Sequence, residues 1–244
     1  MPRKLNSFST LTFDCYGTLI DWESGIWDAL QPLLLANDRD EITRSVALAA
    51  FAEAESRQQA ATPDLLYPEV LRRVHAAIAQ RFDLATGTEL DRNFGGSVAH
   101  WPAFPDTADA LRVLKRRYKL VILSNVHRAG FAASNRKLGV RFDAVYTAED
   151  IGSYKPNPTN FSYLLEHLEA DLGVDRDAVL HTAQSLFHDH VPAAACGLAS
   201  AWIDRQNLSA SEDWGATARV AERPRVDYTF TTMQAMAEAV VAEA

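Results

Sequence analysis

The chain has 244 residues, of which 48% are hydrophobic and 23% are charged, as is typical of a globular protein with a substantial core. Its formal net charge is -8, and no run of Lys and Arg is long enough to follow a phosphate backbone, which argues against a nucleic-acid partner. Two cysteines give neither a disulfide framework nor metal-site spacing, and the apolar run near the N-terminus is too short for a signal peptide or a membrane span. We therefore expect a cytoplasmic protein with no membrane partner.

Short apolar, β-prone runs occupy residues 11–13, 119–123, 144–146, 178–180 and 199–203. Helical patterns fill most of the gaps, at residues 107–117, 129–138, 160–172 and 191–196, and residues 233–241 form a closing helix. Strands that alternate with helices predict βαβ units. The expected fold class is therefore α/β, with a parallel, Rossmann-like sheet and helices on both faces.

The segment from about residue 24 to residue 99 breaks this alternation. It is rich in Ala, Glu, Arg and Leu with helical periodicity, and Pro68 suits the first turn of a helix. We interpret it as an all-helical insert after the first strand. The predicted division is a core domain of residues 1–21 and 100–244 and a helical domain of residues 22–99.

Polar residues follow four of the predicted strands. In an open parallel sheet, ligands bind outside the carboxyl ends of the strands, so these residues should converge on one crevice. A nucleophilic carboxylate, a hydroxyl, a cation and a second carboxylate form a coherent catalytic set, in which the cation keeps the nucleophile ionised. The residues are Asp14 and Thr18 after the first strand, Ser124 and Asn125 after the second, Lys155 after the third, and Gln184, Ser185 and Asp189 after the fourth.

Three of these segments resemble, in order, the first three motifs of the haloacid dehalogenase (HAD) superfamily. They are Phe-Asp-Cys-Tyr-Gly-Thr-Leu at residues 13–19, Leu-Ser-Asn at 123–125 and Tyr-Lys-Pro at 154–156, and residues 188–197 resemble the second half of the fourth motif. The resemblance covers the whole predicted core. It implies a hydrolase whose nucleophile is Asp14, and it places the helical insert where the family has its cap.

Two positions favour one branch of the superfamily. Its phosphatases usually carry a second Asp two residues after the nucleophile, whereas this chain has Tyr16, as in the L-2-haloacid dehalogenases (type II). The phosphatases usually begin the fourth motif Gly-Asp-Ser, where this chain has Ala183, Gln184 and Ser185. One nucleophile and one distant carboxylate are few ligands for magnesium, so no cofactor is expected.

The resemblance implies hydrolytic dehalogenation of a small anionic 2-haloacid through an ester on Asp14. Thr18 would orient Asp14, Lys155 would stabilise its charge, and a water near Asp189 would hydrolyse the ester. The expected substrate-binding residues are Tyr16, Ser124, Asn125, Arg57, Gln184, Ser185 and Phe161. Similar enzymes are often dimers, which suggests a homodimer through an apolar face of the cap.

Three positions depart from the type II pattern. Ala52 lies near the place of a halide-binding Arg, for which Arg57 is the candidate substitute. Phe161 stands where those enzymes have Tyr, and Leu186 where they have Asn. A magnesium-dependent phosphatase acting on a small phosphorylated metabolite, and a non-catalytic binding protein of the same fold, therefore stay open as alternatives.

Overall fold

The computed structural model of the chain describes residues 3–210, 220 and 222–243. Its centre is a six-stranded parallel sheet in the order β3-β2-β1-β4-β5-β6. The strands are β1 (Thr10–Phe13), β2 (Lys119–Ser124), β3 (Ala144–Thr147), β4 (Val179–Ala183), β5 (Ala199–Ile203) and β6 (Tyr228–Phe230).

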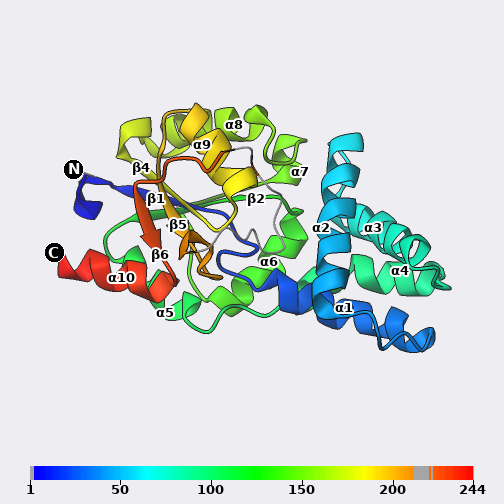
Figure 1. Cartoon of the computed structure of the whole chain (residues 1–244). Helices are drawn as coiled ribbons and strands as arrows, with labels where there is room; N and C mark the ends of the chain where they lie inside the picture. The colour runs from blue at the N-terminus through cyan, green and yellow to red at the C-terminus, as the bar shows by residue number, and fades with distance from the viewer. Residues whose placement is uncertain (1–2, 211–219, 221, 244) are drawn as a thin grey trace.

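The central strands are apolar on both faces, as is typical of a parallel sheet covered by helices on each side. In β2, Leu120 and Ile122 belong to one hydrophobic cluster, and the alternate residues Val121 and Leu123 belong to another. Helices cover both faces, as a doubly wound sheet requires. Figure 1 shows α8 (Pro158–Leu172) and α9 (Val191–Ala195) on one face, and α5 (Thr107–Lys115) and α10 (Met233–Ala242) on the other. Two further core helices are α6 (Arg128–Leu138) and α7 (Ala148–Ile151).

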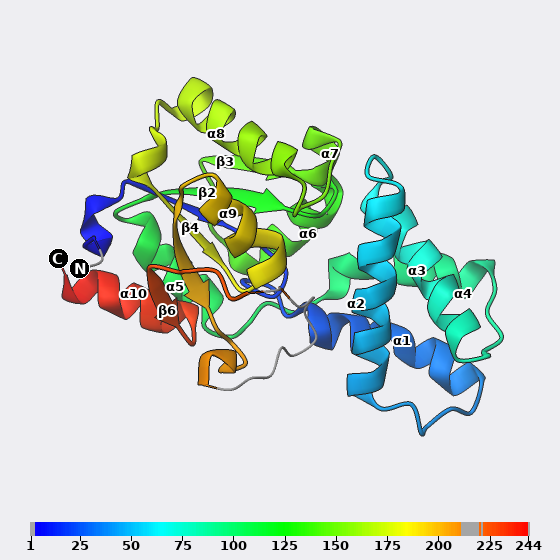
Figure 2. The ribbon, with the colours of Figure 1, turned by 45° about the horizontal axis from the view of Figure 1, so that its top comes forward.

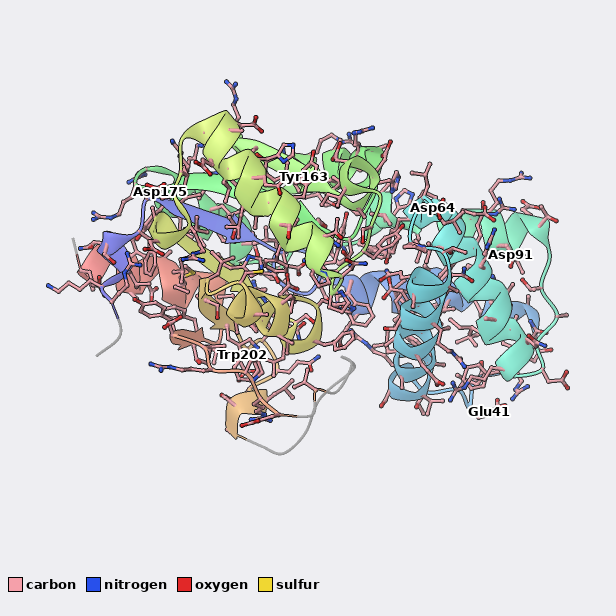
Figure 3. All side chains as sticks on the ribbon, turned by 90° about the horizontal axis from the view of Figure 1, so that it is seen from above. Glu41, Asp64, Asp91, Tyr163, Asp175 and Trp202 are labelled. Carbon is pink, nitrogen blue, oxygen red and sulfur yellow. The ribbon has the colours of Figure 1, made fainter. Side chains whose placement is uncertain are left out.

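The predicted helical insert forms a separate group of helices. They are α1 (Trp22–Ala36), α2 (Arg44–Ala61), α3 (Tyr67–Arg81) and α4 (Thr88–Gly95), and a 3-10 turn at Ser97–His100 leads back to the core. Figures 1 and 2 show α2 as the member of the group that stands along its core-facing side. Figure 3 shows the same separation from above, with Glu41, Asp64 and Asp91 on the insert and Tyr163 on α8.

The insert joins the core at a tight contact between α1 and Trp101. A Cβ atom added to Gly25 would lie 2.3 Å from the indole ring of Trp101, so only glycine lets this helix approach so closely. The Trp101 ring also meets the rings of Tyr16 and Tyr67, with centroid separations of 5.2 Å and 6.3 Å. One buried side chain thus connects the first core loop to two insert helices.

The structure confirms the predicted fold class and adds one strand. The short edge strand β6 was not predicted, and β4 begins and ends later than the expected 178–180. The division into two domains stays a prediction. Within the described residues, no helix combines the length and the apolar character needed to cross a bilayer.

Candidate active site

Asp14 lies at the centre of the sheet, where the direction of strand order reverses. It directly follows β1, which pairs with β2 on one side and β4 on the other. The chain extends the sheet outward from β1 to β2 and β3, then crosses to β4. Such a switch point leaves a crevice at the carboxyl ends of the strands, because the connections on its two sides diverge.

A buried lysine joins two carboxylates in this crevice. The Nζ of Lys155 donates to Asp14 Oδ1 at 3.0 Å, to Asp189 Oδ1 at 2.6 Å and to the carbonyl of Leu123 at 3.0 Å. Only 1% of the Lys155 side chain is exposed. Burial by itself would favour the neutral amine, but the carboxylates of Asp14 and Asp189 outweigh it and raise the pKa of Lys155. Lys155 is therefore a permanent cation between two acids.

The two carboxylates differ in their own ionisation. Burial, together with the charge of Asp189, raises the pKa of Asp14 above its ordinary value, although Lys155 opposes this. Burial also disfavours ionised Asp189, but Lys155 and a hydrogen bond from His181 outweigh it and hold the pKa of Asp189 below its ordinary value. The cluster therefore stabilises the negative charge of Asp189 more than that of Asp14. The Asp14 carboxylate is the less stabilised and more reactive anion.

Thr18 fixes the second oxygen of Asp14. Its hydroxyl donates to Asp14 Oδ2 at 2.8 Å and accepts from the backbone N–H of Gln184 at 2.9 Å. Because the backbone N–H can only donate, the hydroxyl proton must point to Asp14. The predicted geometry of Thr18 beside Asp14 is therefore present.

Asp189 lies on a single turn of π-helix, Leu186–His190, that leads into α9. The side chain of Ser185 caps this turn by accepting from the backbone N–H of His188 at 3.0 Å. His181 Nε2 donates to Asp189 Oδ1 at 3.0 Å, and Asp189 Oδ2 is buried with no hydrogen-bond partner among the described residues. π-turns occur disproportionately at functional sites, and here the turn carries the second acid.

Phe161 is a wrong prediction as a substrate-binding residue. It is fully buried in α8, and its ring packs 5.1 Å from the ring of His181. It does not line the cavity at Asp14. The reason is that α8 covers one face of the sheet, so its inward side reaches the core beneath the crevice rather than the crevice itself.

Asn125 and Ser124 follow β2 but face different surroundings. The Asn125 amide donates to the carbonyl of Lys155 at 2.9 Å, and its Oδ1 accepts from the N–H of Lys155 at 2.7 Å. It thus holds the lysine loop and keeps one N–H for a ligand. The hydroxyl of Ser124 is buried without a partner among the described residues and does not line the cavity. Their binding of substrate stays a prediction.

A cavity of about 80 Å³ opens at Asp14 between the core and the insert. This is well below the roughly 300 Å³ or more of sites for drug-sized ligands, so it suits a molecule of a few heavy atoms. Tyr16, Gln184 and Ser185 line it as predicted. Burial lowers the pKa of His188, which also lines it, to about 4, so this imidazole is neutral at pH 7. The aromatic walls are Tyr16, Trp22, Phe51, Tyr67 and Trp101.

Arg57 is a wrong prediction as a member of this site. Its side chain is 68% exposed and pairs with Glu53 at 3.5 Å, on a different surface of α2. Ala52, Glu55 and Ser56 are the residues of α2 that line the cavity, along with Phe51 and Gln59. Each helical residue turns by about 100°, so Arg57 lies roughly 200° around the helix from Glu55.

Four polar residues of the insert also line the cavity and were not predicted, namely Glu55, Ser56, Gln59 and Tyr67. One signal was available. Phe51, Glu55 and Gln59 are spaced four apart, so one face of α2 carries polar side chains in line with a buried aromatic one. Polar residues on a face that packs inward are a typical sign of a site.

The donor set of the cavity fits magnesium poorly. Asp14 uses both oxygens in hydrogen bonds to Lys155 and Thr18, and one oxygen of Asp189 binds Lys155 and His181. A cation would need to share these oxygens with an ammonium group. In the described part of the chain, no group of three or more His, Cys, Asp and Glu side chains has the arrangement of a metal site. Gln184, which also lines the cavity, could offer a metal ion only a neutral amide oxygen as a ligand.

The model of the haloacid dehalogenase-like hydrolase family matches residues 8–181. An (S)-2-haloacid dehalogenase of Pseudomonas fluorescens is 28% identical over 127 residues, which is 51% of this chain, and the match spans about half (54%) of that protein. The L-2-haloacid dehalogenase of Xanthobacter autotrophicus with covalently bound chloropropionic acid superimposes with a TM-score of 0.77 at 18% identity, covering 97% of this chain and 100% of the other. A HAD hydrolase of Bacillus subtilis bound to magnesium has a TM-score of 0.74 at 18% identity, and the match covers 96% of this chain and 99% of the other.

The family match covers more than half of the chain, and the strand order and the positions of Asp14 and Lys155 agree with it. This chain belongs to the haloacid dehalogenase-like hydrolases.

Proposed function

We propose that the chain is a metal-independent hydrolase that removes halide from small 2-haloacids, with Asp14 as the nucleophile. The observation that carries the proposal is the buried cluster in which one lysine binds two carboxylates and Asp14 is the less stabilised acid. A carboxylate nucleophile must stay ionised and exposed to substrate on one side. The ion pair with Lys155 supports an ionised Asp14, and its place in the lining of the cavity supports access to the substrate.

The first step is a displacement at carbon 2. An oxygen of Asp14 forms a bond to this carbon while the carbon–halogen bond breaks, and the halide leaves with the electron pair. Thr18 and Lys155 hold the carboxylate in a fixed orientation, which lowers the entropic cost of reaching the reactive geometry. Tyr16 stands where the phosphatases of the superfamily usually carry a second Asp, which protonates the leaving group. A leaving halide needs no proton, so this step does not require that acid.

The second step frees Asp14. Water attacks the carbonyl carbon of the Asp14 ester and gives up one proton to a base. The ester C–O bond then breaks at that carbonyl, the second water proton passes to the departing alkoxide oxygen, and the 2-hydroxyacid leaves while Asp14 is regenerated as a carboxylate. A water proton needs an acceptor close to Asp14. The unpartnered Oδ2 of Asp189 supports that residue as the acceptor, and Lys155 keeps it within the same cluster.

The relatives support the choice of substrate. The P. fluorescens protein is named an (S)-2-haloacid dehalogenase, and the X. autotrophicus structure holds chloropropionic acid covalently. The small cavity is consistent with an acid of this size. A homodimer and a cytoplasmic location remain part of the proposal.

The test is halide release from 2-chloroacetate, 2-bromoacetate and fluoroacetate in the presence of EDTA. Wild type should release halide, Asp14→Asn should not, and Arg57→Ala should behave as wild type because its side chain is exposed and outside the cavity. Phosphatase turnover that appears only with added magnesium, without halide release, would overturn the proposal in favour of the phosphatase alternative.

A further inference from the structure

The cavity provides little positive charge for an anionic substrate. Among the described residues that line it, Lys155 is the one permanent cation, and two carboxylates already bind it. Asp14 and Asp189 together carry one charge more than Lys155 neutralises. A 2-haloacid therefore brings its carboxylate, and later its halide, into a cavity whose fixed charge is negative, so it needs a hydrogen-bond donor from elsewhere.

Glu55 is the acid that the insert places in this cavity. It lies on α2, opposite the core residues, and it is half-buried. Its Oε1 accepts from the hydroxyl of Tyr67 at 2.5 Å, which fixes the carboxyl group. Within the described residues, Glu55 forms no ion pair and no hydrogen bond engages Oε2. A carboxyl group in this setting, without a cation, is stabilised in its neutral form.

No ionisable group around Glu55 offers it a free positive charge. The tyrosines and His188 are neutral, and Lys155 already binds two carboxylates. Burial raises the pKa of Glu55 to about 7, although the hydrogen bond from Tyr67 opposes this. The groups are Tyr67 on α3, Asp14 and Tyr16 after β1, Tyr154 and Lys155 after β3, and His188 and Asp189 on the π-turn.

We propose that Glu55, in its protonated form, is the hydrogen-bond donor that receives the negative charge of the substrate. The inference rests on the proposed dehalogenase function and concerns how that site binds its anion. A protonated carboxyl group offers one O–H, and Tyr67 occupies the oxygen that does not donate. A hydrogen bond to an ionised acceptor is about twice as strong as one between neutral groups. The anion is the substrate carboxylate or the departing halide, which require the same donor.

The test compares Glu55→Gln with wild type from about pH 5.5 to about pH 9, because the donor is lost as Glu55 ionises. In wild type, kcat/KM should fall by up to about tenfold per pH unit above pH 7. The amide of Glu55→Gln donates at every pH, so its profile should lose this fall and keep activity at high pH. Glu53→Gln is the matched control, since Glu53 is exposed on the same helix and pairs with Arg57 and Arg81.

Steady-state kinetics distinguish the two anions that Glu55 could bind, the substrate carboxylate and the departing halide. If Glu55 binds the carboxylate, the pH effect appears in KM and in inhibition by acetate, equally for bromoacetate and fluoroacetate. If it binds the halide, the effect appears in kcat and is larger for fluoroacetate, because fluoride is the strongest acceptor. The inference would be overturned if Glu55→Gln showed the same pH dependence of both kcat and KM as wild type.

A second measurement does not depend on turnover or on a variant. Carbon NMR of wild type labelled at glutamate follows the titration of Glu55 with and without acetate or fluoride. An anion that binds only the protonated form must raise the pKa of Glu55, by thermodynamic reciprocity. No shift with either anion would refute the donor role. Wild type that releases no halide would instead refute the proposed function, and the NMR result would still decide the role of Glu55.

Discussion

The unequal stabilisation of the two carboxylates predicts opposite effects of two isosteric substitutions. Asp189→Asn weakens two hydrogen bonds to a charged acceptor, from Lys155 at 2.6 Å and from His181 at 3.0 Å, inside a fully buried site. We expect a loss of roughly 2–4 kcal/mol in the free energy of unfolding. Asp14→Asn instead removes the surplus negative charge and leaves Lys155 with its closer partner. We expect it to be neutral or to stabilise the protein by up to about 1 kcal/mol.

The assay is thermal or urea unfolding of both variants at pH 7. One kcal/mol corresponds to roughly 2–4 °C in a chain of this length, so Asp189→Asn should melt about 5–15 °C below wild type. The pH dependence provides a second check. Because the pKa of Asp14 is raised in the folded state, wild type loses stability relative to Asp14→Asn as the pH rises above the ordinary value of 3.8. Equal destabilisation by the two substitutions at pH 7 would refute the proposed division of charge.

Three further predictions concern single side chains. Thr18→Val removes the donor to Asp14, so kcat/KM should fall roughly tenfold to a hundredfold in steady-state assays; an unchanged value would show that Asp14 is oriented without it. Arg57→Ala should leave the kinetics unchanged and alter the free energy of unfolding by less than about 1 kcal/mol, and a larger kinetic effect would return this residue to the site. Burial lowers the pKa of His190 to about 4, so stability should fall as the pH drops from 6.5 towards 4. Urea titrations should show a smaller fall for His190→Gln, and an equal fall would assign the effect to other groups.

The core of the fold and most of the buried cluster around Asp14 could be predicted because their signals are local. Strands buried on both faces appear as continuous apolar runs, and the residue that ends such a run lies at the ligand-binding edge of the sheet. The structure brings Asp14, Lys155 and Asp189 together, as the strand ends and the order of the motifs predicted, and their catalytic roles stay a prediction. The edge strand β6 was missed because it has three residues, none of them fully buried, which leaves no periodic pattern to detect.

The contribution of the insert could not be predicted in the same way. Which face of α2 meets the core depends on packing between segments far apart in the chain, such as the contact of Gly25 with Trp101. A difference of two residues along a helix reverses the direction of a side chain, so the prediction named Arg57, whereas Glu55 is the residue that lines the cavity. The prediction for Phe161 failed for a related reason, because the inward side of its helix packs into the core beneath the crevice and does not reach the crevice.

The π-turn that carries Asp189 makes the site unusually sensitive to chain length. In this turn the N–H of His190 reaches the carbonyl of Ser185, five residues earlier, at 3.3 Å. The turn therefore contains one residue more than an α-helix would use. Deleting Phe187 would let an ordinary helix form and would rotate Asp189 by about 100° relative to the residues before it, away from Lys155. Point substitutions at Phe187, which is only half-buried, leave this spacing intact. In proteins that share this π-turn, we therefore expect substitutions at the position of Phe187 to be tolerated and insertions or deletions within the turn to be selected against.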